Sequence, residues 1–262
     1  MLQPRIIAQP CRALRVKLAR PALREGHRTH AARRSILTGR LGQDNSVLIG
    51  LIGANVGVYG LWSVADNDRR LRHWMACNFT VTPADVLGRP HTLVTGMFSH
   101  RDGWHLLGNM VTLFFFAPEA ISVLGARAFL QLYFGAGVFS SCCQCVTAHP
   151  YSSALGASGA INAIVTWGVL RNPSAIIITP IEVSVRELHA MHMPPGGGGA
   201  DVLPFPQFIP IPMPALLFGA MYVGKDALGL FRGDSSIGHG SHLGGALCGI
   251  LFFTLTRGRG RY

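Results

Sequence analysis

The sequence predicts an all-α membrane protein whose helices cross the bilayer six times. Only 13% of the 262 residues are charged, about half of the roughly 25% that is typical of a soluble globular domain. The mean hydropathy is +0.33, and uncharged apolar stretches close to the length of a spanning helix recur along the chain. These features exclude a disordered chain, a small secreted disulfide-rich protein and most ordinary soluble enzymes.

The N-terminal part of the chain carries most of the net charge of +11. Residues 1–40 contain ten Lys and Arg and one acidic residue, Glu25, so they carry +9, whereas the other 222 residues carry only +2. A basic, acid-poor arm in front of a nearly neutral apolar body is typical of a targeting presequence rather than of a nucleic-acid surface. We predict that residues 1–46 are a presequence or flexible arm of the mitochondrial type, with a chloroplast transit peptide as the alternative.

Apolar stretches define six predicted spans, at about residues 47–65, 104–124, 128–148, 154–170, 212–230 and 241–256. The fifth stretch is preceded by a proline-rich segment, so its helix is expected to begin near Pro212. The connection at 66–103 is too long for a simple turn and is expected to be partly structured. The glycine-rich segment 182–208 is read as an insertion, either regulatory or merely a spacer. With six spans, the basic arm and the basic C-terminus lie on the same side of the membrane.

The second, fourth and sixth spans begin on the same side of the membrane, and their first turns hold unusual polar residues. These are His105 and Asn109, then Ser158, then His242. Polar and ionisable residues within a membrane are costly and are functional candidates by default. Three separate regions of the chain are therefore expected to bring polar groups together at one membrane depth.

Ser158 and His242 form the pair with the clearest chemistry. A serine hydroxyl is a poor nucleophile until a base takes its proton, and histidine is the usual base. Gly156 and Gly159 flank Ser158 closely enough to let a substrate or another backbone approach. Taken alone, the Gly-x-Ser-Gly segment could equally be a contact between closely packed helices, and His242 could be a buried histidine bonded to a carbonyl.

His242 starts a helical face that is nearly bare of side chains, because Gly245 and Gly249 follow it at helical spacing. Another helix is expected to pack closely there. His105 and Asn109 share one face of the second span and can both donate hydrogen bonds to a developing oxyanion, although polar contacts between helices are the alternative. His239 gives a His-x-x-His spacing with His242, but the sequence offers no third ligand nearby, so we predict no metal and no cofactor.

The ordered set of His-x-x-x-Asn at 105–109, Gly-x-Ser-Gly at 156–159 and His-x-x-Gly-x-x-x-Gly at 242–249 resembles the rhomboid intramembrane serine proteases. Within that family the sequence is most similar to mitochondrial rhomboids of the plant and algal type. The resemblance covers residues 47–262 and implies a catalytic domain with the six-transmembrane-helix rhomboid fold. It implies the mitochondrial inner membrane as the location, with a chloroplast membrane as the alternative.

The resemblance also implies roles for the site residues. Ser158 would be the nucleophile and His242 the general base of a dyad that has no aspartate. The oxyanion would be held by His105, Asn109 and the backbone N–H of Ser158, and Gly156 and Gly159 would shape the loop at the nucleophile.

The implied reaction is cleavage of transmembrane segments of single-span or multi-span membrane proteins in a lipid bilayer, without nucleic acid. Substrate helices would enter between the second and fifth spans, beside Phe114–Phe116. Two alternatives stay open, namely a transporter or channel lined by the polar cluster and a catalytically silent rhomboid-like protein that binds membrane clients. The oligomeric state and the physiological substrate are not predicted.

Overall fold

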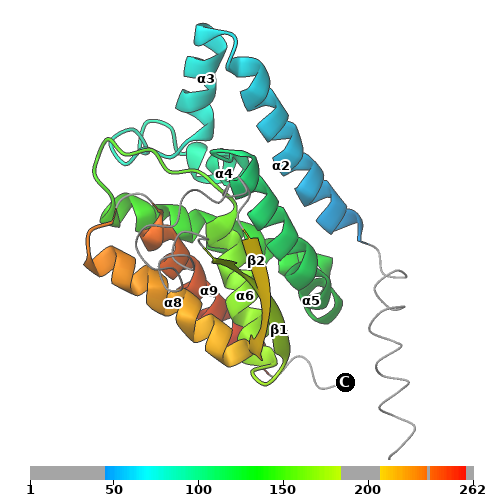
Figure 1. Cartoon of the computed structure of the whole chain (residues 1–262). Helices are drawn as coiled ribbons and strands as arrows, with labels where there is room; N and C mark the ends of the chain where they lie inside the picture. The colour runs from blue at the N-terminus through cyan, green and yellow to red at the C-terminus, as the bar shows by residue number, and fades with distance from the viewer. Residues whose placement is uncertain (1–44, 184–206, 235–236, 258–262) are drawn as a thin grey trace, which may run out of the picture. The chain divides into compact units, whose positions relative to one another are not determined.

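The structure is a computed structural model, and it describes residues 45–183, 207–234 and 237–257 (Figure 1). The predicted presequence up to residue 44 and most of the predicted insertion, residues 184–206, lie outside the described residues. The described chain is mostly helical, with the elements α2 (Ser46–Ala65), α3 (Arg69–Phe79), α4 (Thr92–Thr95), the 3₁₀ turn η1 (Gly96–Phe98), α5 (Gly103–Thr147), α6 (Ser158–Arg171), β1 (Ile176–Val183), β2 (Gln207–Pro214), α8 (Ala215–Phe231) and α9 (His239–Thr256).

Two of the described helices are long and apolar enough to cross a membrane, namely α2 and α5. Helix α5 covers both the second and the third predicted spans. Its Gly125 has φ of 78° and ψ of 158°, a conformation that glycine adopts far more readily than other residues. The helix axis changes direction there (Figure 1), so two helical segments lie on either side of Gly125, where the sequence predicted two separate helices.

Helix α6 lies at the centre of the helical core, where it packs against α5 and α9. Nearly all of its side chains from Gly159 to Val169 are buried. The predicted bare face of α9 faces α6, because a Cβ atom added to Gly245 would overlap the carbonyl oxygen of Gly159. A Cβ atom on Gly249 would lie 2.5 Å from the carbonyl oxygen of Ala163. The close helix contact expected from the two glycines is therefore confirmed.

The connection between the first two predicted spans is partly structured, as the sequence predicted, and contains α3, α4 and η1. Backbone hydrogen bonds also join this connection to the segment that leads into α6. Val81 and Ala154 form an antiparallel bridge, and the Gly156 N–H donates to the Gly96 carbonyl at 2.9 Å. The connection thereby fixes the approach of the chain to Ser158.

The fifth predicted span was placed at about residues 212–230, whereas its helix begins at Ala215, and the mostly helical described chain also contains two strands that the sequence did not predict. Residues 207–214 form a strand, β2, which pairs antiparallel with β1, and α8 begins only at Ala215. Pro210, Pro212 and Pro214 explain the difference, because proline lacks the N–H group and is poorly tolerated in the interior of a helix. The predicted fourth span also begins too early, since residues up to Ala157 precede the first turn of α6.

Candidate active site

Ser158 is the first residue of α6, at the point where the tethered 148–157 segment becomes helical. The Ile161 N–H donates to the Ala157 carbonyl, so the helix begins directly at this serine. The first N–H groups of a helix have no acceptor within the helix, and the positive end of its dipole lies there. The serine hydroxyl therefore stands beside backbone donors that can stabilise a negative charge.

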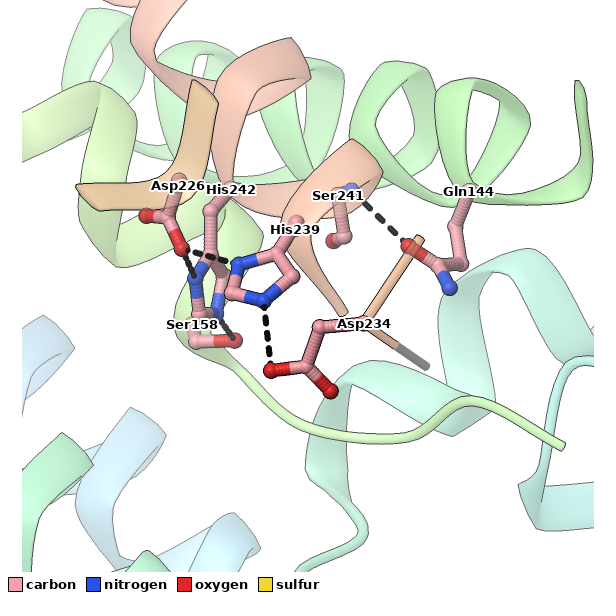
Figure 2. Close-up of polar contacts among 7 residues, drawn as sticks. All are labelled: Gln144, Ser158, Asp226, Asp234, His239, Ser241 and His242. Carbon is pink, nitrogen blue, oxygen red and sulfur yellow. Dashed lines mark hydrogen bonds and ion pairs between the residues drawn. The ribbon is translucent and has the colours of Figure 1, made fainter. Parts of the chain in front are cut away.

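His242 lies in the first turn of α9 and contacts Ser158 directly (Figure 2). Its Nε2 atom is 2.9 Å from the Ser158 Oγ. The His242 side chain is 16% exposed, so it is largely removed from solvent within the protein. The hydroxyl can donate its hydrogen to Nε2, which is the geometry that a general base needs.

Asp226 on α8 contacts the other side of the His242 ring (Figure 2). Its Oδ1 atom lies 3.0 Å from His242 Nδ1, and its side chain is only 5% exposed. An acceptor at Nδ1 places the ring hydrogen on that atom and leaves Nε2 free to accept from the serine. The structure thus brings together a hydroxyl, an imidazole and a carboxylate in one hydrogen-bonded chain.

Sequence reasoning missed Asp226, because the resemblance implied a dyad that has no aspartate. One signal could have found it, since an ionisable residue inside an apolar helix is a functional candidate with a partner to be named. The sequence does not name that partner. Asp226 and His242 are on different helices, and only the packing of α8 against α9 brings them together.

Three further contacts hold the first turn of α9 in place (Figure 2). His239 Nδ1 lies 2.7 Å from the same Asp226 Oδ1 atom, and its Nε2 lies 3.5 Å from Asp234 Oδ2. On the α5 side, the Ser241 N–H donates to Gln144 Oε1 at 3.0 Å. The helix that carries His242 is therefore fixed to both α8 and α5.

His105, in the first turn of α5, lies across from Ser158. A Cβ atom added to Gly156 would be 3.0 Å from His105 Cε1, 3.2 Å from His105 Nε2 and 3.7 Å from Ser158 Oγ. The Arg101 N–H points at His105 Nδ1 at 3.3 Å, which leaves the ring hydrogen on Nε2. The donor nitrogen of His105 therefore borders the space beside Gly156, which Ser158 Oγ also borders.

Gly156 keeps the space between His105 and Ser158 open. Its φ of 128° is in the region that favours glycine, and a side chain would occupy this space. Gly159 has a different place from the one implied by the resemblance, since a Cβ atom there would lie 2.5 Å from Ser140 Cβ and 2.7 Å from Ser241 Oγ. Gly159 therefore allows α5 and α9 to approach α6.

Asn109 is buried one turn after His105. Its Nδ2 atom donates to the His105 carbonyl at 2.8 Å. An amide group carries two N–H donors, so one stays available for a further acceptor. The structure brings Ser158, His242, His105 and Gly156 together, and joins Asn109 to this group through the His105 carbonyl.

Two polar residues next to α5 have shifted pKa values. Burial lowers the pKa of His100 to about 4, with the neighbouring His105 acting in the same direction, and the two rings are 5.0 Å apart. His100 therefore carries no charge at neutral pH. The hydrogen bond from the His105 N–H lowers the pKa of Asp102, which caps the N-terminus of α5.

A hydroxyl, a base that can take its hydrogen and a carboxylate that orients the base are the parts of a nucleophilic site. Within the described ranges, no group of three or more His, Cys, Asp or Glu side chains is arranged to hold a metal ion. The geometry suits attack by Ser158 on a carbonyl whose oxygen lies near His105 and the N-terminus of α6.

Comparison with known proteins identifies a Rhomboid domain over residues 87–190. The chain is 30% identical over 239 residues, or 84% of its length, to RHOMBOID-like protein 12, mitochondrial, of Arabidopsis thaliana. It is 32% identical over 222 residues, or 82% of its length, to the presenilin-associated rhomboid-like protein, mitochondrial, of Bos taurus. A shorter similarity, 36% over 98 residues and 37% of this chain, is to Rhomboid-like protein 16, chloroplastic, of Arabidopsis thaliana, of which it covers 30%.

The chain spans 61% of the length of the plant mitochondrial relative and 49% of the bovine one. The matched domain contains Ser158, His105 and Asn109 and ends before Asp226 and His242, which lie within the part of the chain described above. The motifs, the helical core and these similarities agree with one another. The chain belongs to the rhomboid family and is similar to its mitochondrial members.

Proposed function

We propose that this protein is an intramembrane serine endopeptidase that cleaves transmembrane segments of other membrane proteins. The observation that carries the proposal is the hydrogen-bonded chain from Asp226 through His242 to Ser158. Family membership supports a protease of this type. A site for covalent catalysis needs an activated hydroxyl, and this chain of contacts supplies the base and its orienting group.

In the first step, the Ser158 Oγ attacks the carbonyl carbon of the scissile peptide bond. The hydroxyl proton moves to His242 Nε2, 2.9 Å away. The resulting imidazolium keeps its Nδ1–H donated to Asp226, whose negative charge stabilises it. Asp226 is thus a positioning residue, since it acts on the substrate only through His242.

The negative oxygen of the tetrahedral intermediate would lie in the space that Gly156 leaves open. His105 Nε2 borders this space. The first N–H groups of α6 have no acceptor within the helix and lie beside Ser158, and Asn109 is held to His105 by a hydrogen bond. Each such donor contributes about 2.7–4 kcal/mol to transition-state stabilisation in serine proteases. His242 then gives its proton to the leaving amine, and a water molecule hydrolyses the acyl-enzyme by the same route in reverse.

The proposed arrangement in the membrane has six spans, formed by α2, the two segments of α5, α6, α8 and α9. Within the described residues, α8 packs on α9 and α6 and makes little contact with the α5 segment that carries His105. Phe114 and Phe115 on α5 and Leu217 and Met221 on α8 are exposed. We propose that a substrate helix enters between these two helices and unwinds locally, because an intact helix satisfies its own backbone groups.

We further propose the mitochondrial inner membrane as the location, with residues 1–46 as the targeting arm and residues 47–262 as the catalytic domain. The plant and bovine relatives that match most of this chain are both named as mitochondrial. The basic N-terminal arm also has the composition of a mitochondrial presequence. The active site would open toward the intermembrane space. A chloroplast membrane is the alternative location.

The test is cleavage of a fluorescent single-span reporter in liposomes by the purified protein. The reporter carries small residues and a helix-breaking Gly or Pro near the cleavage position. We expect wild type to cleave and both Ser158→Ala and His242→Ala to lose activity. Ser63→Ala and His73→Ala are the matched controls, since Ser63 and His73 are exposed and lie on α2 and α3, outside the site.

Three other outcomes would contradict the proposal. Equal cleavage by all variants would mean that Ser158 and His242 are not the reacting groups. Loss of activity in the control variants as well would mean that the assay follows folding rather than chemistry. If wild type leaves intact both the reporter and a set of mitochondrial membrane proteins, while a known rhomboid cleaves the reporter, the protein is a client-binding member of the family.

A further inference from the structure

His239 is the second histidine that contacts Asp226 (Figure 2). Its side chain is 3% exposed, and its Nδ1 atom lies 2.7 Å from Asp226 Oδ1. This is the same oxygen that lies 3.0 Å from His242 Nδ1. Two rings one turn apart on α9 therefore share one carboxylate oxygen on α8, although the mechanism described above uses only one of them.

The fold leaves a space shaped for the His239 ring. Gly229 is three residues after Asp226 on α8, so both residues lie on one face of that helix. A Cβ atom added to Gly229 would overlap three atoms of the His239 ring. Any other residue at position 229 would therefore displace the ring from Asp226, whereas a Cβ atom on Gly224 of the same helix would have no neighbour within 4 Å.

The sharing of one oxygen fixes the carboxylate in a way that His242 alone does not. A carboxylate oxygen has two lone pairs, and here one accepts from each Nδ1–H. The two donors belong to different side chains, so rotation of the carboxylate away from either ring would break a hydrogen bond. Because charge-assisted hydrogen bonds are the strong ones, the pair of histidines holds Asp226 in one orientation.

We propose that His239 is a positioning residue of the protease, holding the Asp226 carboxylate against His242 from the neighbouring turn of α9. The inference rests on the proposed function and deepens it by adding a residue that acts through Asp226. In this proposal, the two histidines of the His-x-x-His spacing on α9 hold one carboxylate rather than a metal ion.

His239 belongs to a cluster of ionisable side chains around one carboxylate. The others are Asp226 and Tyr222 on α8, Asp234 after α8, and His242 on α9. A change at His239 therefore reaches His242 through the Asp226 oxygen that both rings contact.

The test uses two substitutions of the same residue. His239→Asn keeps an N–H donor near the position of Nδ1, and His239→Leu removes the donor. The kcat and KM of reporter cleavage in liposomes are measured for both, for wild type and for His149→Asn, an exposed histidine outside the site. Gly229→Ala and Gly224→Ala form a second pair that leaves His239 in place.

We expect His239→Leu and Gly229→Ala to lower kcat by about tenfold or more with little change in KM, as when an outer hydrogen-bond partner is removed from a functional group. We expect His239→Asn to recover most of the activity.

Several results would overturn the inference. They are a wild-type kcat in His239→Leu, an equal loss of kcat in the Asn and Leu variants, and a wild-type kcat in Gly229→Ala. A misfolded variant is recognised by a lower thermal unfolding temperature in detergent, and the Gly229→Ala pair then decides the question. If wild type itself is inactive, or Ser158→Ala is active, the proposed function fails instead, and the two failures are distinguishable.

Discussion

Asp226 and His242 come from two different helices, and a 3.0 Å contact between Oδ1 and Nδ1 joins them, with the Asp226 side chain only 5% exposed. The carboxylate has its partners within the protein, since His239 contacts the same oxygen. A buried carboxylate without partners would be strongly unfavourable. The hydrogen bonds from the two histidines therefore stabilise the buried negative charge of Asp226. The carboxylate in turn fixes the tautomer of His242.

Asp226→Asn removes this negative charge with almost no change in shape. We expect kcat to fall by about 10²–10⁴-fold with KM nearly unchanged, because the imidazolium of His242 loses the group that stabilises it. Reporter cleavage in liposomes measures both constants. Asp66→Asn is the control, since Asp66 lies at the exposed end of α2. A wild-type kcat in Asp226→Asn would show that Ser158 and His242 work as a dyad.

Gly156→Ala is expected to abolish cleavage. The added methyl group would lie 3.0 Å from the His105 ring and 3.7 Å from Ser158 Oγ, in the space where the oxyanion is proposed to form. Gly233→Ala is the comparison for a methyl group added at a positive φ without a steric neighbour, because Gly233 has a φ of 70° and open space around it. We expect Gly233→Ala to keep its activity. If Gly156→Ala cleaves as fast as Gly233→Ala, the oxyanion does not occupy this space.

Gly245→Ala is expected to destabilise the protein, since its methyl group would overlap the Gly159 carbonyl and push α9 away from α6. Overpacking of a close contact costs about 1–3 kcal/mol. Thermal unfolding in detergent, followed by circular dichroism, measures the loss. Gly135→Ala on α5 has no neighbouring atom within 4 Å and should unfold at or above the wild-type temperature. Equal stability of the two variants would contradict the close packing of α6 and α9.

His100 predicts a loss of stability in acid. Burial lowers its pKa from 6.5 to about 4, so between these values the unfolded chain takes up a proton that the folded protein does not. Stability contributed by the neutral ring is complete above about pH 6.5 and falls by about 2 kcal/mol at pH 5. His100→Gln should show a smaller difference in unfolding temperature between pH 7.5 and pH 5 than wild type. His149→Gln, an exposed control, should show the wild-type difference.

Most helices could be predicted from the sequence, because an apolar helix in a membrane is specified locally by length and composition. Val47 and Ala65 bound the first predicted span, and α2 covers Ser46–Ala65. The fifth span shows the limit of this reasoning. Hydropathy alone places Pro212 in an apolar stretch. The prolines of this stretch lack the N–H groups that a helix needs, which favours strand β2. Strand β2 also depends on its pairing with β1, which comes from an earlier part of the chain.

The sequence by itself determined that the chain is an apolar, mostly helical protein with Ser158, His242 and His105 at the starts of separate helices. Membrane helices that run in the same direction begin at the same depth of the bilayer. Composition and spacing were therefore sufficient to predict that these three residues lie close together. Only the tertiary structure decided that Asp226 and His239 join them. Hydropathy does not encode which face of α8 meets α9. That contact depends on side-chain packing between helices, where Gly229 leaves space for one ring and two N–H donors compensate one buried charge.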